Sequence, residues 1–320
     1  MSLNANSQKQ LNRGFLVAVT SAIVLSFTAI LIQMISQNYQ LPALILAYWR
    51  EIFVALSLLP ALLITKPALL RLEKPHLPFL VLFGLVLALF NMLWTLSVTL
   101  IGASVATVLV YCSGAFTAIL GWWLLKETLG WKKIAAVMLC LLGALFVSGA
   151  TNPAAWEANA LGIVTGVLSG LMYAFYSLMG RSATQRGINP WTALFYTFLF
   201  ASFFMLLTNL LPGSVIPGTA STPSEMFILG NRWAGWLLLL LLAAGPTLLG
   251  FGLYNVSLSL LPSSTTNLIV TVEPVFTAIT AYFLLDERLS PLELLGSGLI
   301  LIALVILRMR KKTPGTANGK

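Results

Sequence analysis

The stretches FTAI at Phe116–Ile119 and LLKETL at Leu124–Leu129 return 160 residues later as FTAI at Phe276–Ile279 and LLDERL at Leu284–Leu289. The intervening residues align at the same offset without a gap. Self-similarity at this scale indicates two related structural units. The chain is therefore predicted to contain two repeats, residues 1–150 and 151–312, and a flexible cytoplasmic tail, 313–320.

The composition predicts an integral membrane protein. Of the 320 residues, 58% are hydrophobic and 8% are charged, whereas soluble domains are about 25% charged. Apolar segments long enough to cross about 30 Å of hydrocarbon recur along the chain, which predicts an all-α protein with ten transmembrane helices. These segments are Phe15–Gln37, Pro42–Thr65, Pro78–Thr99, Ala103–Leu125, Trp131–Gly149, Leu161–Gly180, Trp191–Leu211, Gly235–Ser259, Ser263–Leu285 and Pro291–Leu307.

The basic residues set the predicted orientation. When the N-terminus is placed in the cytoplasm, all of the 18 Lys and Arg residues except Arg50, Arg232 and Arg288 fall on the cytoplasmic side. Cytoplasmic loops of membrane proteins carry such an excess. The distribution of these residues therefore predicts a multi-pass protein of the cell inner membrane with both termini in the cytoplasm. It also accounts for the net charge of +9, so no nucleic-acid partner is predicted.

Five spans in each half make the two repeats inverted. The loop with Lys126 and Lys132 is predicted to be cytoplasmic, whereas its counterpart with Asp286 and Arg288 is predicted to be external. Inverted repeats of this kind, related by an axis in the membrane plane, are typical of alternating-access carriers.

The second half resembles the EamA-type family of the drug/metabolite transporter superfamily. The stretch GFGLYNVSLSLLPSSTTNLIVTVEPVFTAITAYFLLDERLSPLELLGSGLILIALVIL, Gly250–Leu307, carries the resemblance, and NMLWTLSVTLIGAS, LLKETLGWKKIAAVMLCLLGALFV and YWREIFVALSLL carry it in the first half. The resemblance implies ten helices, two inverted repeats and an exporter. In one departure, Ser113-Gly114 stands where the second half has Glu273-Pro274, so we expect the fourth span to be less broken than the ninth.

Glu273 is the leading charged candidate because it lies near the middle of the ninth span. Acids at this depth are costly and face protein or water, so Glu273 either carries a proton, contacts the solute or ties helices together. Pro274 removes a backbone hydrogen bond and is expected to break the helix there. Pro246, after Gly245 in the eighth span, marks a second candidate hinge.

Arg50 is the other charged candidate, next to Glu51 in the second span. Adjacent helical residues point about 100° apart, so we expect Arg50 and Glu51 not to pair well. The long side chain of Arg50 can extend toward the external end of the span, or it can meet another carboxylate or the carboxyl group of a solute. Because the family that the chain resembles has an arginine at this place, a structural or gating role is favoured over substrate binding.

Polar and aromatic side chains of facing spans complete the predicted substrate site. Tyr111 lies on a polar stripe of the fourth span, and the repeat offset places the matching stripe, Asn267 and Thr271, in the ninth span. Rings and amides suit an amphipathic solute or, by cation–π attraction, a cation; packing and interhelical hydrogen bonding are the alternatives. The remaining candidates are Asn91, Trp94, Tyr173, Tyr176 and Tyr254.

No motif indicates an enzyme: the chain lacks a Walker loop, HExxH and GxSxG with a plausible base, so no cofactor or metal is predicted. We expect a secondary transporter that exports or equilibrates small organic metabolites, with amino acids or similar zwitterions favoured and proton coupling open. The alternatives are an organic-cation exporter or a non-transporting membrane protein such as a lipid-handling enzyme or assembly factor. Its expected partners are a small-molecule substrate and the lipid bilayer, in a monomer or homodimer.

Overall fold

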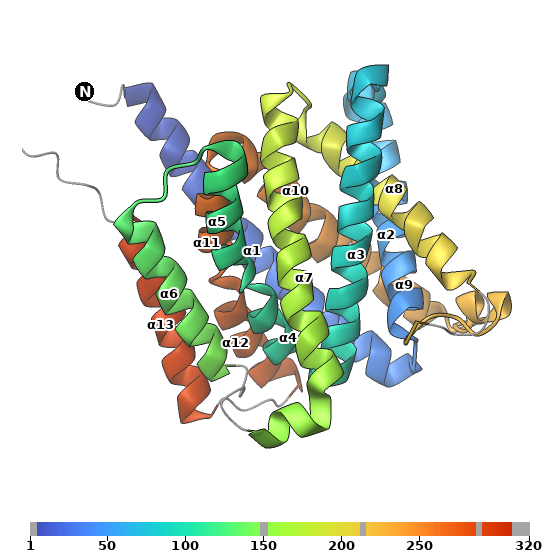
Figure 1. Cartoon of the computed structure of the whole chain (residues 1–320). Coiled ribbons are helices and arrows are strands. Elements are labelled where there is room, and N and C mark those ends of the chain that lie inside the picture. Colours follow the sequence, from blue (N-terminus) through green and yellow to red (C-terminus); the bar gives the residue numbers. More distant parts are fainter. Residues whose placement is uncertain (1–4, 148–152, 212–215, 286–289, 309–320) are drawn as a thin grey trace, which may run out of the picture.

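The computed structural model describes residues 5–147, 153–211, 216–285 and 290–308, and this part of the chain is helical with short connections (Figure 1). The predicted tail, 313–320, and the Asp286–Arg288 turn lie outside the described residues. The long helices are α1 (Ala5–Tyr39), α2 (Ala43–Thr65), α3 (Leu77–Ile101), α4 (Ala103–Val110), α5 (Ser113–Leu125), α6 (Trp131–Val147), α7 (Pro153–Gln185), α8 (Pro190–Asn209), α9 (Trp233–Leu242), α10 (Leu248–Leu260), α11 (Ser263–Val270), α12 (Glu273–Leu285) and α13 (Pro291–Arg308).

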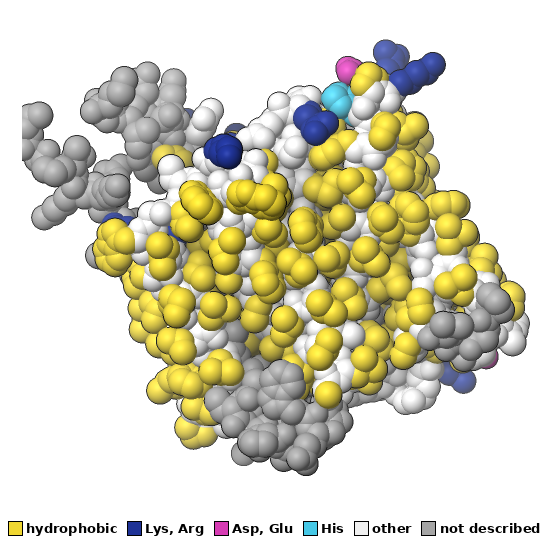
Figure 2. Space-filling view, in the orientation of Figure 1, with side chains coloured by type: hydrophobic (Ala, Val, Ile, Leu, Met, Phe, Trp, Pro, Cys, Tyr) yellow, Lys and Arg dark blue, Asp and Glu magenta, His cyan; other side chains and the backbone are white. Residues whose placement is uncertain are grey.

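The surface between the two ends of the molecule is apolar, as a bilayer requires. Eight helical segments among the described residues are long and apolar enough to cross a membrane, and they match the predicted spans apart from the fifth and tenth, which correspond to α6 and α13. A broad band of hydrophobic side chains covers the face seen in Figure 2, and most Lys and Arg side chains on that face gather at its upper end. The protein is therefore a multi-pass membrane protein.

The two halves of the chain interlock. Helix α1 packs against α10 and α12, and α3 packs against α7 and α8, while α6 and α13 pair at one edge (Figure 1). Equivalent contacts join the halves: the Ser97 hydroxyl donates to the Gly162 carbonyl at 2.8 Å, and the Ser257 hydroxyl donates to the Gly14 carbonyl at 3.1 Å. Ser97 and Ser257 are counterparts in the repeat, so the sequence repeat is also a repeat of packing.

Both the fourth and the ninth spans are broken near their middle. Helix α11 ends at Val270 and α12 begins at Glu273, and α4 ends at Val110 while α5 begins at Ser113. The expectation that the fourth span is less broken is therefore wrong. No proline is needed there, because the Tyr111 and Cys112 amides bond to carbonyls three residues earlier at 3.1 Å, and such bonds tighten the chain locally.

A glycine stripe on α7 allows the broken fourth span to approach closely. A Cβ on Gly170 would lie 2.9 Å from the Val110 carbonyl oxygen and 3.2 Å from the Ser113 nitrogen. Apolar burial drives helix association only weakly inside a bilayer, so close backbone approach through small residues contributes instead. Gly162 and Gly166 also face close neighbours, but these are side chains: a Cβ would lie 2.5 Å from Ile101 Cγ2 of α3 at Gly162 and 2.9 Å from Leu109 Cδ1 of α4 at Gly166.

The eighth span bends at the predicted position. Between α9 and α10 the chain forms one π-helical stretch, Ala243–Thr247, in which Gly245 has non-helical φ/ψ angles of −81° and −106° and is followed by Pro246. Proline cannot donate the helical hydrogen bond, so its position accounts for the kink. The hinge role of Pro246 stays a prediction.

Candidate functional site

A narrow cavity lies where the two broken spans meet α1, α3, α7 and α10. About 20 Å³ of it is open to the centre of a water-sized sphere, which is room for roughly one water molecule. The cavity is therefore too small in this structure to hold an organic metabolite. The cavity is lined by Leu25, Thr28, Phe90, Trp94, Val110, Tyr111, Tyr173, Phe251 and Glu273.

Glu273 is the acidic group of the cavity wall. It is the first residue of α12, and its side chain is 4% exposed. The Tyr111 hydroxyl, at the break between α4 and α5, donates a hydrogen bond to Glu273 Oε2. The two breaks thus bring together one residue from each half of the chain, and the carboxyl group keeps further acceptor capacity toward the cavity.

Aromatic rings form most of the remaining wall. Tyr173 of α7 stacks on Phe90 of α3 with ring centroids 5.0 Å apart and on Tyr254 of α10 at 5.3 Å. Tyr111 meets Tyr173 edge to face at 6.2 Å. Offset and edge-to-face arrangements are the favourable ones for aromatic pairs, so the wall is a fixed apolar surface with polar groups at its margin.

A polar network ties α5, α7, α10 and α11 together beside these rings. The Asn267 amide donates to Ser177 Oγ at 3.1 Å and to the Tyr254 hydroxyl at 3.4 Å, while its Oδ1 accepts from Ser113 Oγ at 3.0 Å. Ser177 Oγ and the Tyr254 hydroxyl are 2.6 Å apart. Because these groups are buried, the network satisfies polar atoms that would otherwise be costly and orients the Tyr254 ring.

A second network places two charges next to the cavity. Asn91 of α3 accepts from Arg50 Nη2 at 2.6 Å and donates to Glu51 Oε1 at 2.5 Å. Arg50 Nη2 also lies 3.4 Å from Glu51 Oε1, so the expectation that these neighbours do not pair well is wrong. Both side chains are at most 1% exposed. The Asn91 amide bridges the two groups, and in a water-free site each charge needs the other.

Arg50 lies behind Trp94. Its guanidinium carbon is 5.5 Å from the centroid of the Trp94 ring, a cation–π distance, and the ring itself lines the cavity. Arg50 is therefore in contact with the cavity wall without lining the cavity itself.

Several buried polar atoms lack a hydrogen-bond partner among the described residues. Thr28 Oγ1 and Trp94 Nε1 belong to cavity-lining residues, and Arg50 Nε, Glu51 Oε2 and Thr95 Oγ1 belong to the network behind the ring or to its neighbours on α3. Unpartnered buried polar groups are rare in folded proteins. The residues of the cavity wall thus include one hydroxyl and one indole N–H without a partner among the described residues, and one carboxyl that accepts a hydrogen bond from Tyr111.

Of the predicted site residues, four line the cavity and five lie behind its wall. Trp94, Tyr111, Tyr173 and Glu273 form its wall. Behind the wall lie Asn91, Arg50, Tyr176, Tyr254 and Asn267, which join the networks described above or, for Tyr176, accept a hydrogen bond from Asn255 at 2.7 Å.

Thr271 points elsewhere. Its hydroxyl bonds to the Leu268 carbonyl at 2.6 Å and lies 3.5 Å from Cys140 Sγ of α6. Pro274 follows Glu273 in the first turn of α12, where a missing amide hydrogen costs little.

Sequence reasoning did not single out Thr28, Phe90 and Phe251 of the wall, or Ser177 of the network. Phe251 carried a usable signal, because it is the repeat counterpart of Asn91. Thr28 and Phe90 carried none, since small polar and aromatic residues are common in membrane helices and only the helix crossing selects these two.

The chain matches the model of the EamA-like transporter family twice, over residues 12–149 and 160–309. It is 23% identical to an uncharacterized transporter of Synechocystis sp. over 74% of this chain and 68% of that protein. It is also 23% identical to a probable amino-acid metabolite efflux pump of Escherichia coli (strain K12), over 85% of this chain and 89% of that protein.

A similarly named pump of Salmonella typhimurium is 23% identical over 84% of this chain and 86% of that protein. A solved crystal structure matches with a TM-score of 0.69 at 16% identity, over 92% of this chain and 96% of that chain. The fold is therefore shared with a known structure.

Proposed function

Because the chain belongs to the EamA-like transporter family, we propose that it is a secondary transporter that exports or equilibrates small organic metabolites by alternating access. The observation that carries this proposal is the cavity at the crossing of two broken, repeat-related spans. Substrate sites of inverted-repeat carriers lie near mid-membrane at such discontinuous helices. The narrowness of the cavity fits a closed intermediate of the transport cycle.

The favoured solute is an amino acid or similar zwitterion with an apolar or aromatic side chain. The carboxyl of Glu273 suits an ammonium group, and the free Trp94 indole N–H, with Arg50 behind it, suits a carboxylate. The rings of Phe90, Tyr173 and Phe251 suit an apolar side chain. Two relatives named as amino-acid metabolite efflux pumps support the same class.

An organic cation is the second candidate. The cavity wall holds one acid and no base, and the nearby base, Arg50, is engaged by Glu51 and Asn91. A ring-lined site with a carboxyl is the usual chemistry for holding a cation. The two candidates differ in whether the solute needs its own carboxylate.

Proton coupling, where it exists, is assigned to Glu273. It is the acid in the cavity wall, and its Tyr111 partner holds it at the boundary between the two halves. Facilitated diffusion requires no such role and leaves Glu273 as a group that binds the solute or joins helices.

The proposed topology has ten spans, with α6 and α13 as the fifth and tenth, in two inverted five-helix repeats. The basic loops lie in the cytoplasm together with both termini, and the membrane is the cell inner membrane. The protein acts as a monomer or homodimer. The basic end of the molecule in Figure 2 supports this orientation.

Uptake and counterflow in proteoliposomes test the proposal, with labelled amino acids, nucleobases and organic cations as the solute pool and protein-free liposomes as the control. Counterflow of at least one amino acid is expected. Flux of organic cations alone would replace the first candidate by the second, and no flux of any solute would contradict the transporter proposal. Gradient-driven flux that is lost in Glu273→Gln, while counterflow persists, is the result expected of a proton carrier; equal gradient-driven flux in both proteins would refute that role.

A further inference from the structure

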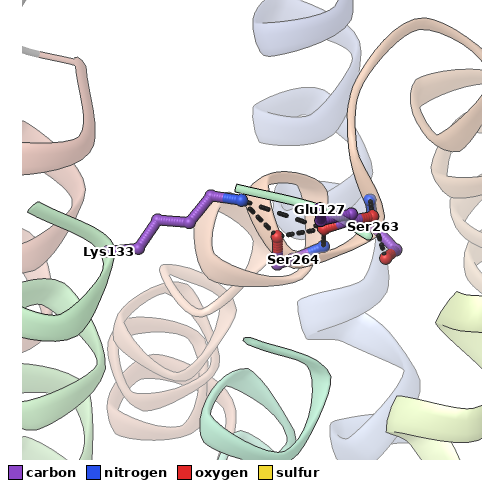
Figure 3. A network of polar contacts seen from close by, with 4 residues as sticks. All are labelled: Glu127, Lys133, Ser263 and Ser264. Atoms are coloured by element: carbon purple, nitrogen blue, oxygen red, sulfur yellow. Dashed lines mark hydrogen bonds and ion pairs between the residues drawn. The ribbon is translucent and has the colours of Figure 1, made fainter. Parts of the chain in front are cut away.

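A carboxylate from the first half of the chain caps a helix of the second half, far from the cavity. Glu127 lies in the turn between α5 and α6 and takes hydrogen bonds from both Ser263 and Ser264 at the start of α11 (Figure 3). Glu127 Oε1 accepts from the Ser263 amide at 2.7 Å and the Ser263 hydroxyl at 2.5 Å. Glu127 Oε2 accepts from the Ser264 amide at 3.2 Å and from the Ser264 hydroxyl.

Helix α11 depends on this contact for its cap. The residue before it is Pro262, which makes no side-chain capping bond, so the first amides of α11 have no local acceptor. A carboxylate at a helix N-terminus also interacts favourably with the helix dipole. Lys133 of α6 adds to the group by donating to Ser264 Oγ at 2.6 Å and lying 3.8 Å from Glu127 Oε2 (Figure 3).

The backbone conformation just before Glu127 directs its side chain toward α11. Lys126 ends α5 in the left-handed region with φ of 56°, and the Glu127 amide returns to the Gly121 carbonyl at 3.1 Å. A Cβ on Gly121 would lie 3.1 Å from Glu127 Oε2. A non-glycine residue in the left-handed region is uncommon, and here it turns the carboxylate toward α11.

The contact lies at the end of a face of α5 whose other end meets the Asn267 network beside the cavity. Along one face of α5, at positions i, i+4 and i+8, Ser113 bonds to Asn267 of α11, Thr117 is buried, and Gly121 adjoins Glu127. Helices α5 and α11 are therefore held together at the level of the cavity network and again at the end of the molecule.

The equivalent helix start in the first half is held differently. Ala103, the repeat counterpart of Ser263, donates its amide to the neutral Gln33 side chain of α1 at 2.6 Å. Charge-assisted hydrogen bonds are roughly twice as strong as neutral ones. The start of α11, which a carboxylate caps, is therefore held more strongly than the start of α4, which a neutral amide caps.

We propose that Glu127 is a latch: its bonds to Ser263 and Ser264 hold the α5–α6 end of the transporter closed, and opening the cavity toward that end requires them to break. The inference rests on the proposed transport function, because a gate has meaning only in a protein that opens. The latch joins the α5–α6 turn of the first repeat to the start of α11 in the second.

Cysteine accessibility measures this opening without any substrate. Thr117→Cys is placed in a background with Cys112→Ala and Cys140→Ala, the protein is reconstituted in nanodiscs, and the rate of labelling by a bulky water-soluble maleimide is followed. Glu127→Ala is expected to raise the labelling rate by about 10-fold or more, since it removes all four hydrogen bonds to the carboxylate and the loss of a single bond to a charged group already shifts an equilibrium about 10- to 100-fold. Glu127→Gln, which keeps one acceptor, is expected to lie in between.

Glu225→Gln is the matched control, because Glu225 also accepts a backbone amide, from Ser221 at 2.8 Å, in the loop before α9 at the opposite end. Its labelling rate is expected to equal that of the parent. Unchanged labelling in both Glu127 variants, with both eluting as folded protein, would overturn the latch and leave the transport proposal intact. Faster labelling together with an absence of counterflow in the wild type would support the gate and contradict the proposed transport function.

Discussion

Replacing Asn91 by leucine tests how the buried charges beside the cavity are stabilised. The change removes the bond from Arg50 Nη2 at 2.6 Å and the bond to Glu51 Oε1 at 2.5 Å, and it leaves the 3.4 Å contact between Arg50 and Glu51 as their main compensation. Hydrogen bonds to charged groups contribute about 1.5–3 kcal/mol each, but those measured between membrane helices average about 0.6 kcal/mol. For the two bonds together these figures set limits of about 1 and about 6 kcal/mol. We therefore expect the free energy of unfolding to fall by an intermediate amount, about 2–4 kcal/mol.

The triple variant Arg50→Met, Glu51→Leu, Asn91→Leu separates two explanations of that loss. If the cost comes from leaving charges poorly satisfied, removing both charges restores much of the stability, because buried ion pairs are often no more stable than apolar replacements. The free energy of unfolding is measured in mixed micelles for the wild type, the single variant and the triple variant. A single variant as stable as the wild type, or a triple variant less stable than the single one, would refute the reasoning.

Three other outcomes are expected. Gly170→Ala drives a Cβ to 2.9 Å from the Val110 carbonyl and should destabilise the protein by about 1–3 kcal/mol relative to Gly298→Ala, whose Cβ meets nothing within 4 Å; equal unfolding free energies would contradict the close packing. Burial raises the pKa of the Glu127 carboxyl, but the hydrogen bonds from Ser263 and Ser264 together lower it by more, so the pKa lies below its usual value. The stability difference between wild type and Glu127→Gln should therefore be constant above the pKa of an unfolded glutamate and shrink as the pH falls through the lowered pKa, and a difference that grows in acid would contradict the assignment. Trp94→Phe keeps the ring and removes the N–H, so KM should rise for a zwitterion and stay unchanged for an organic cation; a rise for both would assign Trp94 to packing.

The sequence predicted the eight spans that the described residues support, because hydropathy is a local signal. Pro274 also indicated the break in the ninth span, whereas the matching break in the fourth span was not predicted. The sequence also drew attention to both Tyr111 and Glu273, which the helix crossing then brings into contact. The partners of Arg50 were not predictable, since helical geometry alone argues against Glu51 and only the position of Asn91 on α3 supplies the bridge.

Side-chain direction and contacts between halves account for the remaining differences. Thr271 shares a stripe with Asn267 in the sequence, yet the break after Val270 turns its hydroxyl toward Cys140. The sequence analysis did not single out Glu127, because its acceptor role depends on the start of α11, which is distant in the chain. The break in the fourth span has no proline signal, since hydrogen bonds three residues apart and the approach of Gly170 define it.

Solute counterflow in proteoliposomes that contain Thr28→Trp tests the central claim, that the cavity at the crossing of the broken spans is the transport site. Thr28 lines the cavity, whereas Phe27, its neighbour on α1, is 44% exposed on the outer surface. Counterflow should be abolished in Thr28→Trp, which fills the cavity, and should continue at the wild-type rate in Phe27→Trp. A folded Thr28→Trp protein that transports at the wild-type rate would contradict the account.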